Sequence, residues 1–294
     1  NNDEMKGKES EGTKVRDVMV DDVAYVTVPG TREQLMDVCK SKHISGVPVL
    51  KGGQVVGVVT RQDLLRNRDE DQIALLMHRN PIIISPEATI AEAAEIIHSH
   101  GIRRLPVGVG EKLVGLVTIA DLIREIAKRD YKETINNYIG DITMAAWDEM
   151  PLSVVGRIME LARVKAAPVL NLELELVGLI TDLDLINVSV IEDTTEQSDL
   201  SLGSDEDAWS WEGMRDTMRL YYDVSKIKLP DKLVKDVLVK DVITVTRNSE
   251  VSDCARKMSE NKFDQLPVIS ARGKLSGMLI DKDLLRVLFE GTVQ

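Results

Sequence analysis

Apolar residues along the chain follow a pattern that recurs four times. Each copy contains a short apolar strand with a proline at its centre. These strands are residues 47–49, 105–107, 167–169 and 266–268. About nine residues after each proline, a glycine opens a second apolar strand that leads to an aspartate. The four aspartates, spaced 58, 63 and 99 residues apart, are Asp63, Asp121, Asp184 and Asp283. Such a period marks a repeat architecture, so the pattern predicts four copies of one structural unit.

The segment before each proline has the period of an amphipathic helix, because small or apolar residues fall nine, twelve and thirteen positions upstream. In the second copy, Thr89 and Glu92 predict a capping box and Gly101 predicts the helix end. Runs ahead of the helices predict one more strand per unit, at 25–28, 82–85, 142–144 and 242–246. Each unit is therefore strand, helix, strand, strand, helix. A unit of about 60 residues is too small to bury both faces of its sheet, which predicts that units pair.

The spacing of the repeats divides the chain into two halves with one long insertion. The predicted boundaries are a disordered start at 1–13, a first pair at 14–130 (units at about 14–68 and 72–130) and a second pair at 131–294 (units at about 135–189 and 233–290), with the insertion at about 190–232. Within it, residues 192–207 hold seven acidic residues and no basic one, which predicts a solvated, mobile segment. Residues 209–224 carry two of the three tryptophans, which favours a helix covering an apolar edge over a partner-docking helix.

Composition narrows the class of protein. The 294 residues carry a formal net charge of −12, which argues against binding to nucleic-acid phosphates or anionic lipid. Two cysteines, Cys39 and Cys254, cannot form a disulfide framework, and their place on the apolar helix face predicts buried packing. No apolar run approaches the roughly 18–20 residues of a membrane span, and the polar start does not resemble a signal peptide. We therefore expect a cytoplasmic protein without a membrane contact.

Catalytic signatures are weak in this sequence. The four histidines form no His-Glu-x-x-His motif, and the two cysteines form no Cys-x-x-Cys motif. No nucleophile, metal cluster or redox group stands out from the 49 acidic residues. We expect no enzyme, no metal and no catalytic cofactor.

The apolar-Pro-apolar strand, the glycine-led strand ending in Thr-x-x-Asp and the order of elements together resemble the CBS domain. Four copies resemble two tandem pairs, or Bateman modules, and such a chain is similar to the γ subunit of AMP-activated protein kinase and its stand-alone archaeal relatives. The resemblance implies an α/β fold in which two modules form a flat disk. It also implies ligands in clefts between paired units and a non-catalytic, energy-sensing role.

The resemblance assigns roles to the repeated motif. The aspartates Asp63, Asp121, Asp184 and Asp283 would accept the hydroxyls of a ribose, as an ionised carboxylate can. The threonines three residues earlier, Thr60, Thr118 and Thr181, would hold phosphate beside a helix start. Thr-x-x-Asp is also a helix-capping motif that needs no ligand, so both interpretations stay open. The fourth copy departs from the family pattern, with Ile280 in place of threonine.

The resemblance further implies basic residues for the phosphate. Two and three residues before the proline, the second copy has Arg104 and Arg103 and the third copy has Lys165. The resemblance also places a basic residue just before the ribose aspartate, and Lys282 stands there in the fourth copy. The planar guanidinium of an arginine can bind two phosphate oxygens at once. The alternative is that Arg103 and Arg104 bind no ligand and are a solvated pair on the protein surface. In the fourth copy Asp264 would repel a phosphate, so the first module is predicted to be the better phosphate site.

The leading hypothesis is a regulatory sensor that binds AMP, ADP or ATP and relays occupancy to a regulated protein partner of unknown identity. S-adenosylmethionine is a rival ligand because it shares the adenosine. The alternative is a ligand-free scaffold that binds a protein through the insertion, and a homodimer is left open. Nucleic acid is not an expected partner, because of the acidic charge.

Overall fold

A computed structural model gives the structure of the chain. It describes residues 12–42, 44, 46–60, 63, 70–140, 144–162, 164, 166–181, 184–185, 188, 190–191 and 227–290. Four of the expectations above fall wholly or mostly outside these residues: the disordered start at 1–13, the role of Lys165, the character of 192–207 and that of the aromatic segment 209–224.

The first half of the chain contains two copies of the predicted unit. The elements of the first repeat are η1 (Val15–Asp17), β1 (Val26–Thr27), α2 (Arg32–Ser41), β2 (Gly46–Lys51) and β3 (Gln54–Thr60). Those of the second are α4 (Ile73–Leu76), β4 (His78–Arg79), α5 (Ile90–His100), β5 (Arg104–Val109), β6 (Lys112–Thr118) and α6 (Ile119–Lys128).

The second half repeats this order. The elements of the third repeat are η2 (Ile135–Tyr138), β7 (Ile139–Gly140), β8 (Ala146–Trp147), α7 (Leu152–Ala162), β9 (Ala166–Leu170) and β10 (Leu176–Thr181). Strands β11 (Val190–Ile191) and β12 (Ile227–Lys228) then pair across the base of the insertion. The elements of the fourth repeat are η3 (Val234–Asp236), β13 (Val245–Thr246), α10 (Val251–Asn261), β14 (Gln265–Ile269), β15 (Leu275–Ile280), α11 (Asp281–Leu284) and η4 (Leu285–Leu288).

All four repeats pair the proline strand with the glycine-led strand as an antiparallel hairpin, as in β2 and β3. In the first, third and fourth repeats a short first strand also pairs in parallel with the proline strand, as β1 pairs with β2. In the second repeat the strand predicted at 82–85 is reduced to one parallel bridge, Ile84–Val107.

The chain entering one repeat adds an edge strand to its partner's sheet: β4 of the second repeat pairs with β3, and β7 of the third pairs with β15. The exchange is reciprocal. The chain entering the first repeat pairs with β6 of the second through the bridge Val20–Leu116, and the chain entering the fourth pairs with β10 of the third through Leu179–Val239. Edge exchange therefore joins the first repeat to the second and the third to the fourth.

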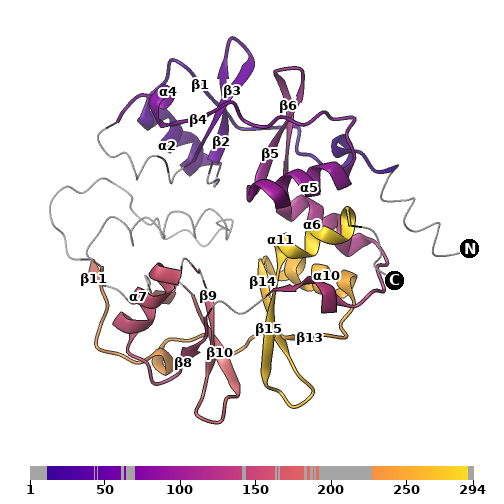
Figure 1. Ribbon diagram of the computed structural model, residues 1–294. Coiled ribbons are helices and arrows are strands. Elements are labelled where there is room, and N and C mark those ends of the chain that lie inside the picture. Colours follow the sequence, from indigo (N-terminus) through magenta and orange to yellow (C-terminus); the bar gives the residue numbers. More distant parts are fainter. Residues whose placement is uncertain are drawn as a thin grey trace, which may run out of the picture.

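The cores show how the repeats pack. One continuous core includes α5 and α6 of the second repeat together with α10, α11 and η4 of the fourth. The first and third repeats have separate cores. In Figure 1 the four units lie around a common centre, and the helices of the second and fourth repeats meet on one side. The two halves of the chain are thus joined in one hydrophobic core through their second members.

The helix of the second repeat has the start and the end that its sequence predicts. Helix α5 begins with the Thr89–Glu92 capping box and ends at Gly101, whose φ of 65° suits glycine, so both predictions are confirmed. Both cysteines are buried as expected. Among the helices that the structure describes, none has the length and apolar character needed to cross a lipid bilayer.

Two of the three residues of the strand predicted at 142–144 lie outside the described part of the chain, and Met144 belongs to no strand. The strand that pairs in parallel with β9 is β8, at Ala146–Trp147, and Ala146 is buried.

Candidate ligand clefts between paired repeats

The Thr-x-x-Asp motif forms a helix cap in three of the four repeats. The Oδ2 atom of Asp63 accepts hydrogen bonds from the Thr60 amide at 2.8 Å and the Thr60 hydroxyl at 2.6 Å. The pairs Thr118–Asp121 and Thr181–Asp184 show the same two contacts. Capping therefore occupies the Oδ2 oxygen of each of these aspartates. A ribose hydroxyl would have to donate its hydrogen bond to the other carboxylate oxygen, Oδ1.

The second carboxylate oxygen of the aspartate has different neighbours in the first and second repeats. His78 Nε2 lies 2.8 Å from Asp63 Oδ1, while the Arg124 guanidinium donates to Asp121 Oδ1 at 3.1 Å. Burial raises the pKa of Asp184, and the bonds from Thr181 oppose that rise. A ribose diol at Asp63 would have to share this oxygen with His78 or displace it.

Arg104 extends from its own repeat into the first. Its Nη1 atom lies so close to Gly46 that a Cβ on residue 46 would overlap it. Gly46 is the strand partner of Thr60, so the guanidinium of Arg104 lies beside the strand end that carries the Thr60–Asp63 cap. We call the region defined by Gly46, Thr60, Asp63, His78 and Arg104 the first cleft.

Arg103 points elsewhere. Its guanidinium makes a two-pronged ion pair with Asp281 of the fourth repeat, at 2.6 Å and 3.4 Å. Burial raises the pKa of Asp281 to about 6, although the positive charge of Arg103 opposes this rise. The structure therefore separates the two neighbouring arginines, because successive residues on an extended chain face opposite sides.

The predicted ligand residues of the fourth repeat lie at the contact between the second and fourth repeats. His98 Nε2 is 3.7 Å from Asp283 Oδ1. The Nζ atom of Lys282 is 3.6 Å from the place that a Cβ on Gly101 would occupy. Ile280 gives helix α11 no side-chain cap. These residues are therefore gathered next to the second repeat, with Asp283 in a setting unlike that of the other three aspartates.

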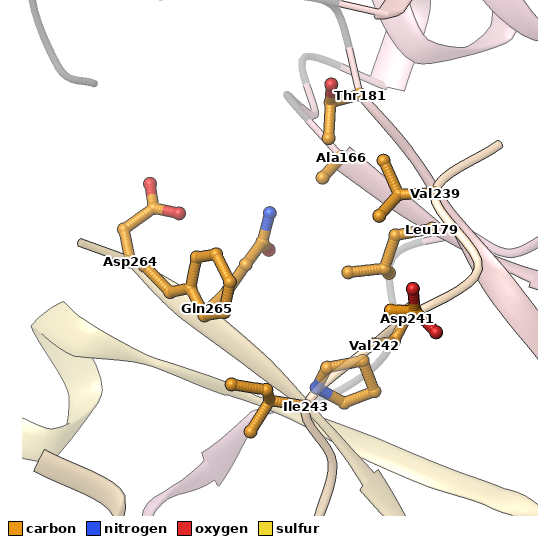
Figure 2. A pocket seen from close by; sticks show the side chains of 11 residues that line it. Ala166, Leu179, Thr181, Val239, Asp241, Val242, Ile243, Asp264 and Gln265 are labelled. Carbon is orange, nitrogen blue, oxygen red and sulfur yellow. The ribbon is translucent and has the colours of Figure 1, made fainter. Parts of the chain in front are cut away.

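A pocket of about 100 Å³ lies between the third and fourth repeats. Its lining residues are Ala166, Leu179, Thr181, Val239, Asp241, Val242, Ile243, Phe263, Asp264, Gln265 and Pro267. Figure 2 shows Asp264 and Gln265 on one side, with Thr181, Val239 and Leu179 across from them. We call this pocket, together with the cap aspartate Asp184, the second cleft. A further cavity of about 720 Å³, with Lys51 and Arg79 among its lining, lies beside β3 and β4.

Sequence reasoning missed several residues of these clefts. Gly46, His78, Asp241 and Asp281 were not assigned a role, although His78 and Val239 share the same offset, 28 residues before the repeat's proline. Aligning the repeats over that longer interval places His78 and Asp241 on corresponding segments, whereas Asp281 is found only through its contact with Arg103. Within the described residues, no three His, Cys, Asp or Glu side chains are arranged to hold a metal ion.

The architecture defines a class of protein: repeated strand-helix-strand-strand units, paired by edge-strand exchange, with clefts at the strand ends. Three segments of the chain, 15–70, 72–128 and 234–290, match the family model of the CBS domain. These segments make up more than half of the 294 residues, so the chain belongs to the CBS domain family. Elements β8 to β10 give the third repeat the same order of elements.

Relatives extend over nearly the whole chain. The uncharacterized protein MJ1225 of Methanocaldococcus jannaschii is 26% identical over an alignment of 280 positions that covers 87% of this chain and 91% of that protein. The structure of an uncharacterized conserved protein from Pyrococcus horikoshii is 26% identical, has a TM-score of 0.68 and covers 94% of this chain and 100% of its own. The structure of MJ1225, described as a suggested archaeal homologue of γ-AMPK, is 23% identical at a TM-score of 0.62, and covers 93% of this chain and 99% of its own. At that identity the last comparison supports the fold alone.

Proposed function

We propose that the chain is a non-catalytic regulatory module that binds an adenine nucleotide in the first cleft and relays its occupancy to a protein partner. The observation that carries the proposal is the approach of Arg104 to Gly46 beside the Thr60–Asp63 cap. An arginine fork next to a threonine hydroxyl and a helix start suits a phosphate, and the Asp63 carboxylate suits a ribose diol.

The charge pattern adds support. In a chain with a net charge of −12, an arginine is brought across a repeat boundary to a position where glycine gives it room. His78 faces Asp63 from the exchanged strand β4, so a ligand at Asp63 contacts both repeats of the pair. A ligand that prefers one arrangement of the two repeats would shift their equilibrium, which is the physical requirement for a sensor.

The test is isothermal titration of the full chain with AMP, ADP and ATP, with GTP as the base control. We expect Arg104→Ala to weaken AMP binding roughly 10- to 100-fold, since hydrogen bonds to charged groups contribute about 1.5–3 kcal/mol. Asp63→Asn should weaken adenosine and AMP alike, because it alters the ribose contact and not the phosphate contact.

Arg256→Ala is the matched control, because Arg256 is exposed on α10 and pairs only locally with Asp253. It should leave every affinity unchanged. Equal AMP binding by the parent and by Arg104→Ala would overturn the assignment of the phosphate site. The absence of any adenine-nucleotide binding would favour the scaffold.

A further inference from the structure

The β9–β10 hairpin of the third repeat makes the same turn as the β14–β15 hairpin of the fourth, but with a different residue at the critical position. The Leu174 amide donates to the Asn171 carbonyl at 3.0 Å, as the Gly273 amide donates to the Ser270 carbonyl at 2.9 Å. Both residues are left-handed, with φ of 60° at Leu174 and 73° at Gly273. Glycine adopts this conformation freely, whereas leucine is strained in it. The strain points to a use for the Leu174 side chain.

The tip of the third repeat, residues 171–175, presents two leucines to solvent. Leu172 is 75% exposed and Leu174 is 60% exposed, and the carboxylates of Glu173 and Glu175 alternate with them along the chain. The fourth repeat holds this tip in place, because the Lys274 ammonium donates to the Glu173 carbonyl and Glu175 forms a bridge with Lys274. Neighbouring exposed apolar side chains with polar groups around them are typical of a protein interaction site.

The cavity of about 720 Å³ beside β3 and β4 has the complementary chemistry, and we call it the β3–β4 groove. Lys51, Arg79 and Glu111 are its charged lining residues, so cations outnumber carboxylates by two to one. Arg79 is fixed by donating to the Ala74 carbonyl at 3.0 Å. Within the part of the chain that the structure describes, neither Lys51 nor Arg79 forms an ion pair. The apolar part of the lining includes Val28, Val56, Met77, Pro81 and Ile83.

The tip and the β3–β4 groove lie on opposite edges of the molecule. In Figure 1 the β9–β10 hairpin projects at the bottom, whereas β3 and β4 lie at the top. A tip therefore cannot reach the groove of its own chain, but it can reach the groove of a second copy. The groove is in the roughly 300–1,000 Å³ range of pockets that enclose a drug-sized ligand, which gives room for two leucine side chains. The tip carboxylates would then approach Lys51 and Arg79.

We propose that the tip of one copy, with Leu172 and Leu174, binds in the β3–β4 groove of a second copy, so that the chain self-associates head to tail. The two surfaces are different, so a pair of copies still has one free tip and one free groove. Association therefore continues beyond a dimer as the concentration rises. The inference goes beyond the proposed function and does not depend on it, because no residue that defines the first cleft belongs to either surface.

Sedimentation velocity of the full chain measures the association. A contact of this kind is smaller than a standard stable interface, so the concentration series should run from about 1 µM to about 1 mM. We expect the mean sedimentation coefficient to rise along the series, and to rise less at high salt because exposed charge pairs are screened. Leu172→Ser with Leu174→Gly, the tip variant, should weaken association at least about tenfold. Lys51→Glu with Arg79→Glu, the groove variant, should do the same.

A mixture of the two variants gives the deciding measurement. The tip variant keeps an intact groove and the groove variant keeps an intact tip, so an equimolar mixture should form a heterodimer and nothing larger. Formation of that heterodimer also shows that both variants are folded. Leu161→Ser is the control, because it removes a leucine that is 68% exposed on α7, outside both surfaces, and should leave association unchanged.

Three outcomes would overturn the inference. A parent chain that stays monomeric along the whole series would leave a different protein as the partner of the tip. Self-association that both variants retain would place the contact elsewhere on the molecule. A mixture of the two variants that forms no heterodimer would exclude the head-to-tail contact.

Discussion

The first and second clefts are built from the same elements but differ at the positions that face a ligand. Gly46 and Arg104 stand in the first cleft where Ala166 and Gln265 stand in the second. The glycine is required in the first because Arg104 occupies the space of a Cβ, whereas a shorter glutamine leaves room for alanine. The repeated fold therefore places the same strand ends at both clefts. The residue pair at the two matching positions, glycine with arginine or alanine with glutamine, determines the charge of each cleft.

The repeats also differ in how they are held. The helices of the second and fourth repeats share one core, and the ion pair between the partly exposed Arg103 and the buried Asp281 lies between these repeats. The first and third repeats keep cores of their own. Arg103 belongs by sequence to the cleft-facing position, yet its ion pair ties the two modules together.

The largest expected effect is at this ion pair. Arg103→Met would leave the Asp281 carboxylate buried without its cation, which typically costs about 3–5 kcal/mol. Urea denaturation of the full chain measures the loss. The control is Arg256→Met, which breaks an exposed pair of the same 2.6 Å length and should cost less than about 1 kcal/mol.

The pH dependence of this loss in stability tests whether it arises from the charge of Asp281. The folded pKa of Asp281, about 6, lies above its ordinary value of 3.8, so the stability linked to this group is present below about pH 4 and is lost as the pH rises through 6. Removing Arg103 raises the folded pKa further, so the deficit of Arg103→Met should be larger at pH 8 than at pH 5. Adding Asp281→Asn should abolish that difference, and a deficit independent of pH would contradict the burial of a charge.

The second largest effect is expected when the first cleft is given the residue types that the second cleft has at the matching positions. Gly46→Ala with Arg104→Gln should weaken AMP binding roughly 10- to 100-fold, because the charged hydrogen-bond donor is lost. Binding of 5′-methylthioadenosine should change less than about threefold, because its 5′ group makes no charge contact. Titration of both ligands on one variant separates loss of charge recognition from loss of the site. An equal decrease for both ligands would mean that the cleft itself had collapsed.

The repeat, the order of elements and the capping boxes could be predicted from the sequence because they depend on local periodicity and on residues three or four apart. The destination of Arg103 could not, because its partner Asp281 is 178 residues away and the choice between the two sides of a strand depends on packing between repeats. The acidic character of the second cleft was visible only in part. Asp264 could be recognised because it lies three residues before its proline. Asp241 could not, because only the bridge between Val239 and Leu179 brings the start of the fourth repeat against β10.

A third, smaller effect tests the pairing of glycine with arginine. Gly46→Ala alone should displace Arg104 and weaken AMP binding by roughly three- to tenfold, less than removal of the charged donor. If the effect acts through Arg104, the change should disappear when Gly46→Ala is made in an Arg104→Gln background. Ala166→Gly, the reverse change in the second cleft, should leave nucleotide affinities unaltered. Additive losses in the two backgrounds would show that Gly46 matters for another reason.

The smallest expected effect concerns the cap that the fourth repeat lacks. Ile280→Thr would give helix α11 the cap seen at Thr118, where the hydroxyl and amide bond to Asp121. Ile280→Val removes the same methylene without supplying a hydroxyl, so the difference between the two variants isolates the cap. We expect the threonine variant to be more stable than the valine variant by about 0.5–1 kcal/mol, and Thr118→Val to lose about 1 kcal/mol. If threonine and valine at residue 280 unfold at the same denaturant concentration, Asp283 is held by its position beside His98 too firmly to turn back and cap its own helix.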